Sequence, residues 1–127
     1  MPHFIIDCSE NVLELITPAD LMQLVYEVAE QSDLFAKNDI KVRINSFTHY
    51  QLAPGKENFL HLFGYIMEGR TVEQRAALSK AMISRLAALL PRLSVLSMNI
   101  QEFELATYCN KAMLHADNPG GDRHFGL

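Results

Sequence analysis

The 127-residue sequence lacks the features that mark several large classes of protein. It has two cysteines, Cys8 and Cys109, with no metal-binding spacing, and we expect both to be reduced. No apolar run approaches the length of a membrane span. Acidic residues outnumber lysine and arginine by 15 to 11, which argues against a concentrated basic surface for nucleic acid. We therefore expect neither a membrane nor nucleic acid to be a partner.

Targeting and cofactor motifs are missing as well. The N-terminus has no basic segment and meets Asp7 and Glu10 early, so we expect no signal peptide and a cytoplasmic location. There is no P-loop, no dinucleotide fingerprint and no G-x-S-x-G motif. The five histidines are His3, His49, His61, His115 and His124. None of them forms a pair at the helical spacing of a zinc site, so we expect neither a metal nor a cofactor.

The spacing of apolar residues predicts four strands and two helices. Period-two alternation and short apolar runs indicate strands, which fall at residues 3–8, 40–52, 59–67 and 93–105. Helical spacing behind a threonine cap indicates helices, which fall at residues 17–32 and 68–91. Thr71 and Gln74 have the spacing of a capping box. The run "FLHLFGYIM" is apolar on both faces, which predicts a central strand that is covered on both sides.

This order predicts a single domain over residues 1–127, with a pseudo-repeat of pattern at 2–52 and 57–105 and a tail at 106–127. Two α+β architectures fit it. One is a ferredoxin-like sandwich. The other consists of two fused β-α-β units forming a four-stranded sheet with two helices on one face. In the second architecture the other sheet face is too apolar to stay in water, so the chain should self-associate through it.

Pro2 is the most unusual candidate for chemistry, and two interpretations of it are open. Proline is tolerated at the first residue of a strand, because its missing N–H is not needed there. Alternatively, Met1 is removed, as is usual before a small residue, and Pro2 then carries a free secondary amine. Such an amine is a base fixed in a ring.

Three cations near the ends of predicted strands are candidates for binding an anion. Lys41 and Arg43 share one face of a strand, where like charges repel unless a carboxylate lies between them. Alternatively, the two charges protect an exposed sheet edge from pairing. Arg70 precedes the cap of the second helix, where it either binds an anion beside free N–H groups or is a solvated turn residue. One candidate base and several cations indicate a site that moves protons on a small anionic organic substrate.

Three segments of the chain resemble a known family. "PHFIIDCSEN" and "IKVRINSFTHYQLAPG" resemble the N-terminus and second-strand region of 5-carboxymethyl-2-hydroxymuconate isomerases, in the tautomerase superfamily. "IMEGRTVEQR" resembles the strand-to-helix junction shared with 4-oxalocrotonate tautomerase. The resemblance covers the chain from Pro2 to about Phe103. It implies a fold of two fused β-α-β units and assembly as a homotrimer.

The resemblance also implies a reaction without a cofactor. In this family the amino-terminal proline is the general base, arginines bind substrate carboxylates, and a proton moves from an enol oxygen to a distant carbon in homoprotocatechuate breakdown. Carried over, Pro2 is the base and Lys41, Arg43 and Arg70 bind the substrate. Lys41 replaces an arginine, so it keeps the charge but not the planar two-point bond to a carboxylate. A non-catalytic ferredoxin-like ligand-binding or assembly module is the alternative.

Overall fold

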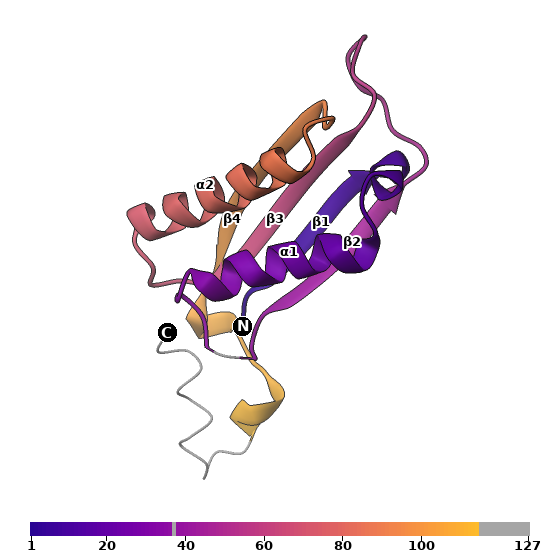
Figure 1. Ribbon diagram of the computed structural model, residues 1–127. Helices are drawn as coiled ribbons and strands as arrows, with labels where there is room; N and C mark the ends of the chain where they lie inside the picture. Colours follow the sequence, from indigo (N-terminus) through magenta and orange to yellow (C-terminus); the bar gives the residue numbers. More distant parts are fainter. Residues whose placement is uncertain (37, 115–127) are drawn as a thin grey trace.

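The computed structural model describes residues 1–36 and 38–114, in which a sheet forms one layer and two helices form the other (Figure 1). The strands are β1 (His3–Ser9), β2 (Lys41–Phe47), β3 (Phe59–Met67) and β4 (Val95–Phe103). The helices are α1 (Pro18–Gln31) and α2 (Val72–Leu89). Short 3-10 helices lie at Glu10–Glu14, Leu105–Thr107 and Lys111–Leu114.

The strand order β2-β1-β3-β4 decides between the two predicted architectures. β1 pairs in parallel with β2, and β3 pairs in parallel with β4, so each β-α-β unit keeps its own two strands together. The units join through the antiparallel pair of β1 and β3. In a ferredoxin-like sandwich the strands of each unit would be split. The prediction of two fused units is therefore confirmed, and both helices lie on one face of the sheet (Figure 1).

The hydrophobic core lies between the sheet and the two helices. Every second residue of the central strands points into it, and the fully buried ones include Phe4, Ile6, Cys8, Leu60, Leu62 and Ile66. α1 contributes Leu21, Leu24, Val25 and Val28, as its apolar spacing predicts. Burial raises the pKa of the Cys8 thiol to about 11, with Asp7 adding to the effect, so Cys8 is a packed thiol and not a nucleophile.

The apolar stripe of α2 is narrower than the sequence predicts. Its buried residues are Leu78, Met82 and Leu86, whereas Ala77, Ala81 and Leu89 of the predicted stripe are exposed. A helix that packs on a sheet from one side buries only the line of residues nearest to the sheet. The predicted capping box is confirmed, since Thr71 and Gln74 each bind the other's backbone N–H.

The opposite face of the sheet has no helix over it within the described residues. Phe63, Tyr65 and Phe103 stack across this face with ring centroids 6.3 and 6.1 Å apart. β3 is central, as predicted, but in the described part of the chain helices cover it on one side only. We call this surface the open sheet face. Its half-buried aromatic side chains form an apolar surface of the kind that marks interaction sites.

Parts of the chain after β4 were predicted only as a tail at 106–127. The described part of this tail holds two short 3-10 helices, Leu105–Thr107 and Lys111–Leu114, and residues 115–127 lie outside the described part of the chain. Among the described residues, no helix is long and apolar enough to cross a membrane.

Candidate active site

The predicted site residues meet at one end of the sheet. Pro2 directly precedes β1, and its carbonyl accepts a hydrogen bond from the Lys41 N–H at 3.1 Å. The parallel register then places Arg43 beside Ile5. β3 runs back to this end antiparallel to β1, and Arg70 follows it. The N-terminus and the start of β2 therefore lie beside the junction between β3 and α2 (Figure 1).

The N-terminus lies in surroundings that disfavour an ammonium group. Pro2 is buried, and the Met1 amine before it donates to the Asp39 carbonyl at 3.0 Å and pairs with the Asp39 carboxylate. Burial lowers the pKa of the Met1 amine to about 6, although Asp39 acts in the opposite direction. While Met1 is present, the Pro2 nitrogen is an amide. Burial at the start of β1 therefore makes a terminal amine easier to deprotonate. Pro2 carries such an amine only after Met1 is removed.

Lys41 and Arg43 lie on the same face of β2, as predicted. Both are exposed, whereas Val42 between them packs against the core. The Lys41 ammonium lies 3.6 Å from an Asp39 carboxylate oxygen and donates to the Asp39 carbonyl at 2.7 Å. A carboxylate thus lies beside Lys41 and offsets part of its charge. Lys41 and Arg43 therefore place two exposed positive charges on the strand that pairs with the N-terminal strand.

Arg70 lies at the same end of the sheet, but its side chain points into the protein. It is 7% exposed, and its guanidinium donates to the carbonyls of Met67, at 3.2 Å, and Leu34. The guanidinium carbon also lies 5.2 Å from the centre of the Phe35 ring. Burial lowers the pKa of Arg70, and Glu102 opposes that effect. Arg70 therefore ties the loop after α1 to the junction between β3 and α2.

Sequence analysis singled out neither His3 nor Asp39. His3 lies beside Arg43, with its Nδ1 atom 3.1 Å from a guanidinium nitrogen. Asp39 lies beside both the N-terminal amine and Lys41. Both residues are close in sequence to predicted site residues, but their contacts with Arg43 and with the N-terminal amine depend on the pairing of β1 with β2.

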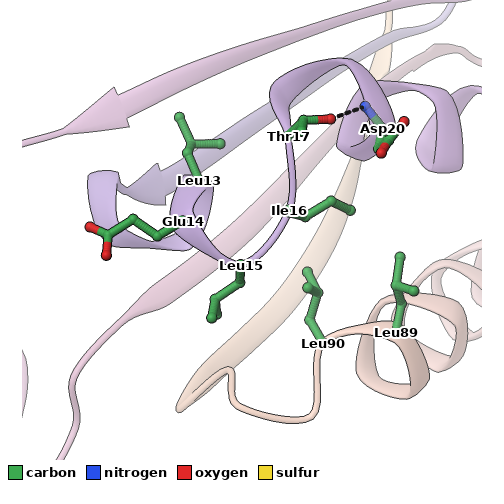
Figure 2. A pocket seen from close by; sticks show the side chains of 8 residues that line it. All are labelled: Leu13, Glu14, Leu15, Ile16, Thr17, Asp20, Leu89 and Leu90. Atoms are coloured by element: carbon green, nitrogen blue, oxygen red, sulfur yellow. Dashed lines mark hydrogen bonds between the residues drawn. The ribbon is translucent and has the colours of Figure 1, made fainter.

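A surface cavity of about 510 Å³ lies at the opposite end of the sheet and contains none of these residues (Figure 2). Its lining is Leu13, Glu14, Leu15, Ile16, Thr17, Asp20, Leu89 and Leu90. The Thr17 hydroxyl accepts a hydrogen bond from the Asp20 N–H as the cap of α1, so it is already used. Across the described ranges 1–36 and 38–114, no three His, Cys, Asp or Glu side chains are grouped as a metal site.

Comparisons with known proteins agree with this geometry. The model of the 5-carboxymethyl-2-hydroxymuconate isomerase family matches residues 2–117. A 5-carboxymethyl-2-hydroxymuconate Delta-isomerase of Escherichia coli is 28% identical over 123 residues, covering 91% of this chain and 98% of the relative. The predictions of the family and of an isomerase are therefore confirmed.

Solved structures show the same fold. A 5-carboxymethyl-2-hydroxymuconate isomerase from Deinococcus radiodurans R1 has a TM-score of 0.75 and 27% identity, covering 87% of this chain and 88% of the other. A fused 4-OT solved as a symmetric trimer has a TM-score of 0.65 and 15% identity, covering 86% and 93%. With strand order, helix placement and sequence in agreement, the chain belongs to the 5-carboxymethyl-2-hydroxymuconate isomerase family.

Proposed function

We propose that this chain isomerises 5-carboxymethyl-2-hydroxymuconate, or a closely similar 2-hydroxy dienoate, with Pro2 as the general base after Met1 is removed. The observation that carries the proposal is the meeting of a buried N-terminus with two exposed cations, Lys41 and Arg43, at one end of the sheet. The Delta-isomerase named for the Escherichia coli relative supplies the substrate class.

In the proposed mechanism, the Pro2 amine takes the proton of the substrate's enol hydroxyl. The resulting ammonium then donates a proton to a distant carbon, which moves the double bond and restores the amine. The step needs no oxidant, reductant or cofactor, because one proton leaves oxygen and one reaches carbon. A base whose pKa lies near the working pH is the most useful one.

The cations have separate parts in this proposal. Lys41 and Arg43 bind the substrate's carboxylates and stabilise the negative charge that develops on the enolate oxygen. Arg43 offers the planar pair of donors that a carboxylate prefers, and Lys41 offers a point charge. The sequence also predicts substrate binding by Arg70, but its side chain is 7% exposed and donates to two carbonyls, so in this proposal Arg70 acts mainly by holding the site together.

A direct assay tests the function. We expect processed protein to convert 5-carboxymethyl-2-hydroxymuconate with a higher kcat/KM than phenylenolpyruvate, because the former offers more carboxylates to the two cations. The change in ultraviolet absorbance of the conjugated substrate measures the rate. Saturable binding without turnover above the uncatalysed rate would instead support the non-catalytic ligand-binding alternative.

We also propose that the chain is a homotrimer assembled through the open sheet face, as the stacked aromatic side chains on it suggest. Light scattering at micromolar concentration is expected to give three times the 14.4 kDa chain mass. Phe63→Glu should dissociate the assembly, because it places a charge among these rings. The control is Val72→Glu, which changes an apolar residue that is already 65% exposed on α2. A monomer mass for the unaltered protein would reject this assembly.

A further inference from the structure

We propose that His3 is a positioning residue, a neutral hydrogen-bond acceptor that holds the Arg43 guanidinium in the orientation that binds a substrate carboxylate. This inference rests on the proposed function, because it deepens the part assigned to Arg43. His3 does not touch the reacting atoms in this proposal. It acts on substrate affinity through Arg43.

The contact between the two side chains is built by the sheet. In the parallel register of β1 and β2, His3 lies opposite Lys41, and Ile5 lies opposite Arg43. His3 and Arg43 are therefore diagonal neighbours on the open sheet face. The Nδ1 atom of His3 lies 3.1 Å from the Nη1 atom of Arg43, which is hydrogen-bond distance. A long exposed side chain thus has one fixed partner at the candidate site.

The His3 ring is itself held in place. It is half-buried, and it packs edge-on against Phe103 with ring centroids 6.0 Å apart and planes at 84°. Phe103 in turn stacks on Tyr65 of β3. A ring that is fixed by packing loses little entropy when it accepts a hydrogen bond, so it can orient a flexible arginine.

The chemistry of the pair fixes the state of the imidazole. A guanidinium only donates hydrogen bonds, so Nδ1 must accept, and the proton of the neutral ring lies on Nε2. Burial lowers the pKa of His3, and the nearby cations, Arg43, Lys41 and the N-terminal amine, lower it further. Asp39 alone acts in the opposite direction. The structure therefore favours a neutral acceptor at neutral pH.

Protonation of His3 would remove this arrangement. The imidazolium has no lone pair on Nδ1, and it adds a positive charge beside Arg43. Arg43 would then lose its fixed orientation. The effect is on binding, so KM should rise at acid pH through the His3 titration, while kcat follows the base that acts on bound substrate.

Two variants distinguish the effect of the His3 hydrogen-bond acceptor from the effect of its aromatic ring. His3→Phe keeps an aromatic ring against Phe103 but removes the acceptor, and it should raise KM about two- to tenfold with little change in kcat, as for one lost hydrogen bond. His3→Asn offers an amide oxygen near the Nδ1 position and should recover most of the affinity. Equal KM for His3→Phe and the unaltered protein, with both folded by circular dichroism, would overturn the inference.

The same variants in a second background show whether His3 acts through Arg43. In Arg43→Ala protein, whose own KM should be raised about tenfold or more, His3→Phe should have no further effect. An undiminished His3→Phe effect in that background would also overturn the inference.

A measurement that does not depend on activity keeps the two proposals apart. Nitrogen-15 NMR of labelled histidine should show the Nε2–H tautomer for His3, and Arg43→Ala should raise the pKa of the ring because a nearby cation is gone. The Nδ1–H tautomer, or an unchanged titration in Arg43→Ala, would reject the role of His3 even in an active enzyme. If the protein has no isomerase activity, the proposed function fails, while the NMR result still decides whether His3 holds Arg43.

Discussion

Protein that retains Met1 is expected to isomerise a 2-hydroxy dienoate at least a hundredfold more slowly than protein from which Met1 has been removed. A positioned general base contributes about 10² to 10⁴ in rate, and this base exists only when the Pro2 nitrogen is free. In the Met1-retaining form that nitrogen is an amide, and the only terminal amine belongs to Met1. That amine lies one residue before the Pro2 nitrogen and is paired with Asp39.

Mass spectrometry and matched kinetics check this expectation. The three samples are processed protein, Pro2→Ala and a form that keeps Met1 ahead of Pro2. Pro2→Ala retains a primary amine at the same position and should keep part of the activity. Equal kcat/KM for the Met1-retaining and processed forms would show that proline only opens the strand, and the mechanism proposed here would be wrong.

The pH dependence of the processed protein has a definite sign. The base acts when it is deprotonated, so kcat/KM should rise with pH through the pKa of the Pro2 amine, after correction for the substrate's own ionisation. Burial lowers the pKa of the neighbouring Met1 amine to about 6 despite Asp39. We expect the same burial, together with Lys41 and Arg43, to act on the Pro2 amine in the same direction.

The elements that the sequence predicts well are those set by local patterns. β3 has the predicted bounds, Phe59–Met67, because its apolar run has a turn on each side. The cap of α2 needs only Thr71 and Gln74. β2 was predicted to continue to residue 52 but ends at Phe47, because its partner β1 ends at Ser9, which lies opposite Phe47. The 3-10 helix Glu10–Glu14 is too short to show a period.

The site was predictable only in part, for the same reason. Pro2, Lys41 and Arg43 became candidates because each is marked by its place at the start of a strand or on one strand face, and their roles stay predictions. The partners that decide what each group does lie far away in sequence. His3 meets Arg43 across 40 residues, and Arg70 meets the Leu34 carbonyl across 36. Local sequence patterns do not predict contacts between residues so far apart. The sequence therefore indicated which charged residues to consider, but not which groups bind and orient them.

Arg70→Ala is expected to lower the free energy of unfolding by about 2 to 4 kcal/mol and to reduce activity with it. The substitution removes two hydrogen bonds to carbonyls and the contact with the Phe35 ring. It leaves the Met67 and Leu34 carbonyls without these donors, and an unsatisfied buried polar group costs free energy. Because Arg70 holds the loop that leads to Asp39 and β2, the candidate site should loosen as well.

The matched control is Arg85→Ala, which removes an exposed arginine from α2. Arg85 pairs with Glu27 at 3.6 Å across the surface, and such pairs contribute about 0 to 1 kcal/mol. Arg70→Lys should have a stability between the other two variants, since an ammonium keeps the charge but cannot reach both carbonyls from one plane.

Chemical denaturation gives the free energies of unfolding of the three variants, and kinetics are measured where each variant is folded. If Arg70→Ala is as stable as Arg85→Ala but loses activity, Arg70 acts mainly on the substrate. Loss of stability with activity recovered by Arg70→Lys would show that it acts mainly by holding the site together.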